Sequence, residues 1–211
     1  MTLITCKDVS KTFRRTPVLR DVDLDVHEGD AVGISGPNGS GKSVLFKLLV
    51  GFMRPDSGTV SIDPRLMGPE RRYPESFGVM INRPGYLGHL SALDNLRELA
   101  SIRRVVGDAR LIEVLESLGL DPGSTTKAKD FSLGMKQKLG IAQAVMERPR
   151  VLVLDEPFNA LDTSSAASVT HLLKGFVEDG GTLLMTSHRS EDLDLLTTRR
   201  LSIDSCRLVE D

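Results

Sequence analysis

Residues 31–43 read AVGISGPNGSGKS, a short apolar run followed by a glycine-rich segment that ends in lysine and serine. The run AVGIS predicts a buried strand, and the residues from Lys42 to about Phe52 predict a helix. The eight residues Gly36–Ser43, which follow the strand and include the first two residues of the helix, fit the pattern G-x-x-x-x-G-K-[ST] in its required setting of strand, turn and helix. Glycines let the backbone fold closely around phosphate oxygens, toward which the first N–H groups of the helix point. The stretch therefore predicts a phosphate-binding loop.

This loop carries its own chemistry. The Lys42 side chain would supply positive charge to the β- and γ-phosphates of a nucleotide, and the Ser43 hydroxyl would ligate Mg²⁺. The alternative is a glycine-rich turn without a ligand, which the agreement of all eight residues and both flanks disfavours. The predicted nucleotide-binding residues of the loop are Gly36, Pro37, Asn38, Gly39, Ser40, Gly41, Lys42, Ser43 and Val44.

A second motif, VLVLDEP at residues 151–157, joins an apolar strand to two carboxylates. Asp155 at the strand end would hold Mg²⁺, directly or through water. Glu156 would orient and polarise an attacking water molecule. A strand that simply ends in solvent-exposed acids is the alternative, and the phosphate-binding loop upstream makes it the weaker one. The chain carries no N/T-K-x-D motif of the kind that recognises guanine.

Strands and helices alternate along the rest of the chain. In residues 18–26 valine and leucine alternate with aspartate, which predicts a strand with one wet face. Other strands are expected at 3–5, 59–62, 78–81, 151–155, 182–187 and 201–203, and helices at 92–106, 109–118, 132–147, 163–177 and 190–197. This order predicts an α/β fold of the P-loop NTPase class, with a mostly parallel, RecA-like sheet core, a small antiparallel β lobe and an inserted helical lobe. We expect one domain over 1–211, with the helical lobe at about 83–150.

The composition argues against several classes of protein. The 211 residues are 40% hydrophobic and 27% charged, and the net charge of −2 provides no basic field for nucleic acid. The two cysteines form no metal-binding or disulfide pattern and suggest a reducing cytosol. No signal peptide is evident, and no apolar run approaches the ~20 residues that span a bilayer. We therefore expect a soluble protein whose membrane role, if it has one, comes through a partner.

Residues 131–138, FSLGMKQK, place a serine at a predicted helix start about twenty residues before the two acids. The order of phosphate-binding loop, helical lobe, this segment and D-E-P resembles the ATP-binding cassette (ABC) ATPase family over nearly the whole chain. The family's usual wording is L-S-G-G-Q, so Ser132 and Gly134 are kept, whereas Leu133 and Met135 depart. The resemblance implies that Ser132 and Gly134 meet the γ-phosphate of ATP bound to another subunit. Ser132 would also serve as an ordinary helix N-cap, and the two roles are compatible.

The resemblance extends to other positions. Phe13 matches the aromatic residue that stacks on adenine, with a place in the core at a strand edge as the alternative. His188 matches the switch histidine that reaches the γ-phosphate. Residues 159–162, NALD, resemble the loop at the dimer interface, and Asp162 would equally be the N-cap of the helix at 163–177.

One position departs from the family. Asn82 stands where the family usually has a glutamine that touches Mg²⁺ or the attacking water. The amide is retained with a reach one methylene shorter, so contact with the metal through water is expected. The predicted metal ligands are thus Ser43, Asp155 and Asn82.

The resemblance implies an ATPase that is the motor subunit of an ABC membrane transporter, an exporter by the wording of the 131–138 segment. Two copies, identical or not, would pair head to tail around ATP and Mg²⁺, with Glu156, His188 and Lys42 as catalytic residues. A membrane permease would be the partner, and the subunit would lie on the inner face of the cell membrane. A soluble ABC ATPase without a transport role and a regulatory subunit with little turnover remain the alternatives.

Overall fold

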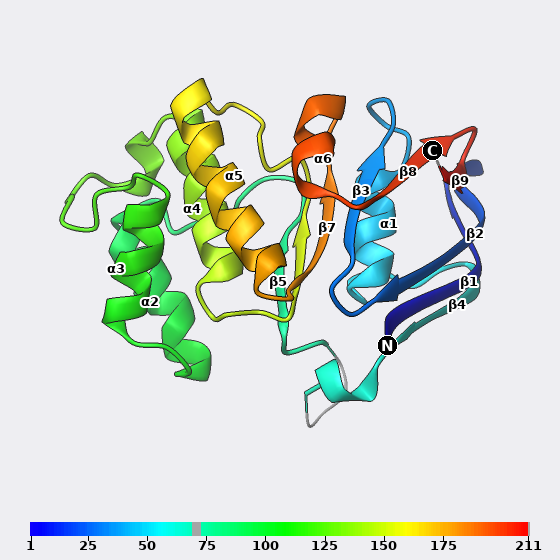
Figure 1. The fold of residues 1–211 in the computed structure, drawn as a ribbon, viewed down its shortest axis with the longest axis horizontal. Helices are drawn as coiled ribbons and strands as arrows, with labels where there is room; N and C mark the ends of the chain where they lie inside the picture. The colour runs from blue at the N-terminus through cyan, green and yellow to red at the C-terminus, as the bar shows by residue number, and fades with distance from the viewer. Residues whose placement is uncertain (69–72, 211) are drawn as a thin grey trace.

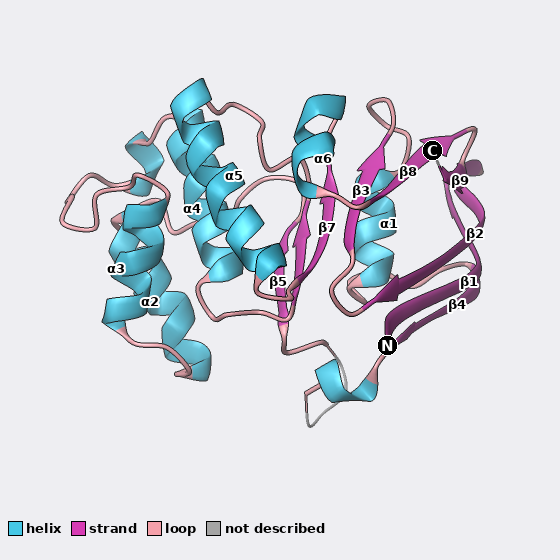
Figure 2. Ribbon diagram, viewed as in Figure 1, coloured by secondary structure: helices cyan, strands magenta, loops and turns pink. Residues whose placement is uncertain are grey.

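A six-stranded sheet forms the centre of the molecule (Figure 1; Figure 2). The computed structural model describes residues 1–68 and 73–210. The strands lie in the order β5-β6-β7-β3-β8-β9. Their bounds are Ala31–Ser35 for β3, Phe77–Met80 for β5, Val151–Leu154 for β6, Thr182–Thr186 for β7, Arg199–Asp204 for β8 and Arg207–Glu210 for β9. All pairings are parallel except the antiparallel pair β8–β9, which confirms the predicted sheet.

Both faces of this sheet are covered. Leu152 and Leu154 of β6 face one apolar cluster, which the surrounding helices complete. Val151 and Val153 face a second cluster, formed with α1 and the antiparallel sheet. A strand buried on both faces has no polar alternation, which is why residues 151–154 read as a continuous apolar run. The helices are α1 Lys42–Leu49, α2 Ala92–Arg103, α3 Asp108–Ser117, α4 Leu133–Val145, α5 Thr163–Glu178 and α6 Ser190–Leu196, with 3₁₀ turns at Pro64–Leu66 and Ala128–Asp130.

The antiparallel lobe is a three-stranded sheet in the order β2-β1-β4. Its strands are β1 Thr2–Phe13, β2 Thr16–His27 and β4 Ser57–Ile62. From Leu19 onward the valine and leucine side chains of β2 are buried and its aspartates are exposed, as the alternation predicts. The expectation of a strand at 3–5 was too short, because shifts of register along β1 break its period-two pattern.

The second difference lies at the C-terminal side of the sheet. The sequence predicts a last strand at 201–203, whereas β8 is longer and β9 follows it. Ser205 and Cys206 make the hairpin turn with φ of 47° and 67°. Such turns usually carry asparagine or glycine, so this pair gives no recognisable turn signal.

A helix cap and a buried amide stabilise the start of the helical lobe, whose helices pack through one apolar cluster. Ser91 accepts a hydrogen bond from the Asp94 N–H and caps α2. The buried Asn95 side chain bonds both backbone groups of Leu87, and fixes the segment before the helix. The helix α2 ends at Arg103 rather than at residue 106, because Arg104 adopts φ 56°.

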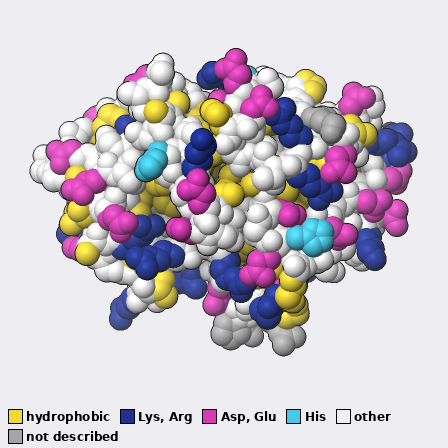
Figure 3. Space-filling model, viewed as in Figure 1, with side chains coloured by type: hydrophobic (Ala, Val, Ile, Leu, Met, Phe, Trp, Pro, Cys, Tyr) yellow, Lys and Arg dark blue, Asp and Glu magenta, His cyan; other side chains and the backbone are white. Residues whose placement is uncertain are grey.

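The surface is mixed in charge. On the face shown in Figure 3, positive and negative side chains are interspersed, without a broad patch of one sign. None of the helices within 1–68 and 73–210 is long and apolar enough to traverse a bilayer.

Cys6 on β1 should be the unreactive one of the two thiols. Its side chain is buried, and burial, with Asp25 and Asp23 nearby, raises its pKa from 9.0 to about 12. At about pH 8 we expect a thiol reagent to label Cys206 in the folded protein and Cys6 only after unfolding. Because the folded pKa lies above the unfolded one, the stabilisation from Cys6 is complete below pH 9 and is lost as the pH rises toward 12.

Mass spectrometry of the labelled peptides would check the first expectation. Urea unfolding of the parent and of Cys6→Ala across alkaline pH would check the second. Equal labelling of both thiols in the folded protein would contradict the assignment.

Candidate active site

Four neighbouring parallel strands, β5, β6, β7 and β3, end at the same edge of the sheet. In open α/β sheets, ligands bind outside the carboxyl ends of the strands. Asn82 follows β5, Asp155 and Glu156 follow β6, His188 follows β7, and the glycine-rich loop follows β3. The strand order therefore gathers the predicted catalytic and metal-binding residues at one edge.

The loop at 36–43 has a backbone that needs its glycines. Gly36 and Gly41 have φ of 144° and 109°. A Cβ on Gly36 would lie 2.8 Å from Ser40 Oγ, and one on Gly41 would lie 3.0 Å from the Val18 carbonyl oxygen. Asn38 and Gly39 are exposed at the tip of the loop, and Val44 is half-buried behind it.

Two observations fit a phosphate group in this loop. The helix α1 begins after Gly41, which has no side chain to cap the first N–H groups. Within the described residues, Ser40 Oγ is buried and has no hydrogen-bond partner. Unpaired N–H groups and an unpaired buried hydroxyl are the donors that phosphate oxygens accept from.

Glu156 contacts both of the other predicted catalytic residues, Lys42 and His188. Its Oε1 lies 3.6 Å from Lys42 Nζ, and its Oε2 lies 2.9 Å from His188 Nδ1. Lys42 is buried, and its ammonium group also donates to the carbonyl oxygens of Gly36 at 2.6 Å and Pro37 at 3.3 Å. One carboxylate thus lies between a lysine and a histidine at the mouth of the phosphate-binding loop.

Asp155 is the centre of a second set of contacts. Its side chain is 4% exposed, and its Oδ2 accepts hydrogen bonds from Ser43 Oγ at 2.5 Å and from the Asn82 N–H at 3.2 Å. Two of the predicted Mg²⁺ ligands, Ser43 and Asp155, are therefore adjacent. Asn82 reaches Asp155 through its backbone at φ 64°, so a role for its side chain at the metal remains a prediction.

Thr186, at the end of β7, belongs to the same network, although the sequence pattern marked it only as a strand residue. Its hydroxyl accepts a hydrogen bond from the Glu156 N–H at 2.8 Å and donates one to Asp155 Oδ1 at 2.8 Å. The only sequence signal was a threonine at the end of a buried strand, two residues before the histidine.

The 131–138 segment forms the start of α4. Ser132 is exposed, and its Oγ accepts a hydrogen bond from the Met135 N–H at 3.1 Å, which confirms it as the N-cap. A Cβ on Gly134 would lie 2.9 Å from the carbonyl oxygen of Ala160. Glycine is therefore required there by the chain's own packing, and contact of either residue with a second subunit remains a prediction.

Alternative roles were predicted for Asp162 and Phe13. Asp162 caps α5, and the hydrogen bond from the Ser165 N–H, with that from Ser164, lowers the pKa of its carboxyl group. Phe13 ends β1 with its ring 41% exposed and the Lys11 ammonium 5.6 Å from the ring centroid. The ring lies outside both apolar clusters, so the alternative of a core residue is wrong, and stacking on adenine remains a prediction.

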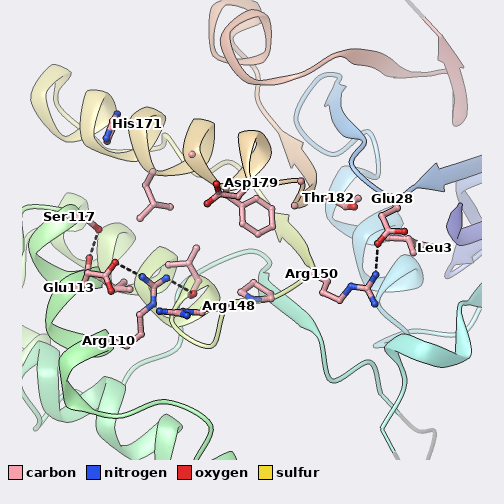
Figure 4. Close-up of a pocket in the computed structure, with 18 residues that line it drawn as sticks. Leu3, Glu28, Arg110, Glu113, Ser117, Arg148, Arg150, His171, Asp179 and Thr182 are labelled. Atoms are coloured by element: carbon pink, nitrogen blue, oxygen red, sulfur yellow. Dashed lines mark hydrogen bonds and ion pairs between the residues drawn. The ribbon is translucent and has the colours of Figure 1, made fainter.

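A cavity of about 690 Å³ lies at the other edge of the sheet (Figure 4). It is lined by residues at or just before the starts of β6 and β7, such as Arg150 and Thr182, and by α3 and α5. Its arginines are partly paired, Arg110 with Glu113 and Arg150 with Glu28. It contains none of the predicted nucleotide-binding residues.

Removing the Thr186 hydroxyl tests the network. In Thr186→Val the Glu156 N–H and Asp155 Oδ1 each lose a partner, so we expect a loss of about 1–3 kcal/mol in the free energy of unfolding. Phosphate release from ATP should fall with it, because both acids lose a positional restraint. Thr186→Ser keeps the hydroxyl and is the matched control. Urea unfolding and a phosphate-release assay would measure both effects, and a Val variant that behaves like the Ser variant would contradict the assignment.

Comparison with known proteins identifies relatives over the full length of the fold. The family model described as ABC transporter matches residues 19–159. The chain is 34% identical over 206 residues to the uncharacterized ABC transporter ATP-binding protein YybJ of Bacillus subtilis (strain 168), covering 98% of this chain and 94% of that protein. It is 30% identical to the lantibiotic transport ATP-binding protein SrtF of Streptococcus pyogenes over 194 residues, which is 92% of this chain and 83% of that protein. Other relatives are longer, and the chain spans 66% and 69% of two of them.

A solved structure resembles the fold closely. The dimeric, post-hydrolysis ATP-binding cassette MJ0796 bound to ADP and Pi matches with a TM-score of 0.87 at 26% identity, covering 99% of this chain and 98% of that one.

Proposed function

The chain belongs to the ABC transporter family, and on this premise we propose that it is the motor subunit of a membrane exporter. It binds and hydrolyses ATP. The observation that carries the assignment of its site is the set of contacts in which Glu156 meets Lys42 and His188 beside the phosphate-binding loop. We assign hydrolysis to this edge of the sheet and the two acids to different tasks there.

Hydrolysis transfers the γ-phosphoryl group of ATP to water. The bond between the γ-phosphorus and the oxygen that leaves with ADP breaks in this step. Glu156 orients the water and accepts its proton, because its carboxylate lies at the mouth of the phosphate-binding loop and is only partly buried, with 17% of the side chain exposed. Lys42 stabilises the charge on the phosphate oxygens, and the exposed His188 ring, held by Glu156, reaches the same group. These side chains are positioned before substrate arrives, so little reorganisation is needed during the reaction.

We also propose that Ser43 and Asp155 hold Mg²⁺. A serine hydroxyl and one aspartate, completed by phosphate oxygens and water, are the ligands that Mg²⁺ takes in P-loop enzymes. The two side chains already share a 2.5 Å hydrogen bond. The metal would neutralise charge on the β- and γ-phosphates. Asn82 lies close enough through its backbone to contribute by way of a water molecule.

A second copy or a related cassette would complete the site. Ser132 and Leu133 are exposed at the start of α4, where the helix N-terminus favours an anion. We propose that this end covers ATP bound to the partner's phosphate-binding loop. The relative MJ0796 has been solved as a dimer in a state after hydrolysis, which supports a head-to-tail pair.

The transport role follows from the relatives. SrtF is named for lantibiotic transport, and other relatives for bacitracin transport and linearmycin resistance. These names favour export of a peptide or antibiotic over a soluble ATPase or a regulatory subunit. The complete network at Glu156 also argues against a subunit with little turnover.

A groove bordered by exposed apolar side chains offers a place for the permease. Two adjoining hollows of about 580 and 300 Å³ share Val79 and Gly85. The larger lies between β5, α2 and α4, and the smaller between β5, α4 and the C-terminal part of α1. Exposed apolar side chains border them, among them Phe52 and Ile102, of which Ile102 is 76% exposed. A helix of a membrane protein would bury these side chains. We propose that the subunit is held at the inner face of the membrane through this groove.

Glu156→Gln tests the enzymatic assignment. We expect ATP hydrolysis to fall by about 10²–10⁴-fold, because the amide cannot accept the proton of water, while ATP affinity changes by less than about threefold. The ATP-bound dimer should then accumulate, measured by sedimentation with and without Mg²⁺. Phosphate release equal to that of the parent would refute the role of Glu156.

Ile102→Glu tests the permease groove. We expect loss of the co-purifying membrane protein from detergent extracts and an unchanged ATPase rate of the isolated subunit, since Ile102 is exposed and the hollow that it lines contains none of the catalytic residues. Val209→Glu places the same charge on an exposed residue of β9 and is the matched control. Equal recovery of the membrane partner with both variants would move the docking surface elsewhere, and recovery of soluble partners alone with the parent would refute the transporter role.

A further inference from the structure

Gln137 is a buried polar residue in the first turns of α4. Its side chain is 8% exposed, and its amide nitrogen donates two hydrogen bonds. One goes to the Glu156 carbonyl oxygen at 2.9 Å and the other to the Pro157 carbonyl oxygen at 3.1 Å. A single side chain from the helical lobe therefore holds two consecutive carbonyls of the segment that carries the catalytic acid.

The backbone at Glu156 needs such a restraint. Its φ is 52°, a left-handed conformation that a residue with a long side chain seldom adopts. The Glu156 N–H is held by the Thr186 hydroxyl, and its carbonyl also accepts the Asn159 N–H at 3.2 Å. Gln137 holds the same carbonyl from the opposite lobe, so it helps to fix the peptide plane and with it the direction of the Glu156 side chain.

We propose that Gln137 is a positioning residue for Glu156 and ties the catalytic carboxylate to the helix that begins at Ser132. The assignment rests on the proposed function. Gln137 lies five positions after Ser132, about 7.5 Å along the helix axis. A shift of this helix end, when it meets nucleotide on a partner, therefore moves the amide that orients the chain's own Glu156. In a head-to-tail dimer, nucleotide bound at one site then changes the position of the catalytic glutamate at the other site.

A purely structural role for Gln137 predicts a different outcome. If the amide only filled a polar gap between two lobes, its loss would lower stability and leave the turnover of the folded protein intact. If it positions Glu156, its loss lowers kcat while the KM for ATP changes little, because Lys42 and the phosphate-binding loop are untouched.

The experiment compares Gln137→Met with Lys138→Met in the full chain. Met keeps the length of the glutamine and removes its donors, and Lys138 is a matched control because it also donates to a carbonyl, that of Gly119, from the same helix. We expect Gln137→Met to lower kcat by about 10–100-fold with KM within about threefold, and Lys138→Met to match the parent. Normal kcat in a folded Gln137→Met would overturn the proposal.

A double-mutant cycle supplies the second reading. In the Glu156→Gln background the residual hydrolysis should not fall further when Gln137 is replaced, because the positioned group is already lost. Additive losses would overturn the proposal. Should Gln137→Met fail to fold, Gln137→Glu retains the size, and its introduced carboxyl group can donate only when protonated. Its activity relative to the parent should then rise as the pH falls from about 8 to 6, and a flat ratio would count against the proposal.

Different outcomes would refute the proposed function and the positioning role of Gln137. A parent protein without ATP hydrolysis would refute the enzyme, whereas a normal parent with an unaffected Gln137→Met would refute only the positioning role.

Discussion

The buried carboxylate of Asp155 is the constraint on which the site depends. An ionised carboxylate removed from water is strongly unfavourable unless hydrogen bonds replace its hydration. Its three donors are Ser43, the Asn82 N–H and Thr186, which come from three different strand ends. The bond to Ser43 joins residues 112 positions apart in the chain. The carboxylate therefore fixes the ends of four strands relative to one another, and the sheet order β5-β6-β7-β3 is what makes this possible.

The residue after Asp155 shows how the two acids acquire different roles. In an extended strand, consecutive side chains point to opposite faces of the sheet. Glu156 adopts a left-handed backbone conformation, so the strand geometry ends there. The Asp155 side chain therefore points into the buried network, whereas the Glu156 side chain points toward Lys42 and His188. A non-glycine residue in this conformation costs about 1–3 kcal/mol and persists only where its surroundings hold it. Thr186 on one side and Gln137 on the other provide that restraint.

What the sequence could predict was set by local patterns. The loop at 36–43 and the acids at 155–156 are contiguous motifs, so their chemistry and their place at strand ends were predictable. The buried strands were predictable because burial on both faces removes polar residues from the run. The full length of β1 was not, since register shifts obscure its alternation, and neither was β9, since its turn lacks glycine.

Thr186 and Gln137 were missed for a related reason. Each is one polar residue in an apolar setting, and its importance comes from partners that are distant in the sequence, 30 residues for Thr186 and 19 for Gln137. A composition pattern does not record such pairings. The signal that remains is the burial of a polar side chain, which requires partners, and only the fold shows which ones.

At the start of α4, some residues are required by packing within the chain, and others can be required only by a partner molecule. Ser132 is required as the N-cap of its own helix, and Gly134 is required because Ala160 leaves no room for a Cβ. These two residues are the ones kept from the usual L-S-G-G-Q wording. Leu133 between them is 73% exposed, so no packing within the chain decides its identity. The fold of the subunit therefore tolerates leucine in place of glycine at position 133. This substitution instead affects the contact with any molecule that binds at the N-terminus of α4.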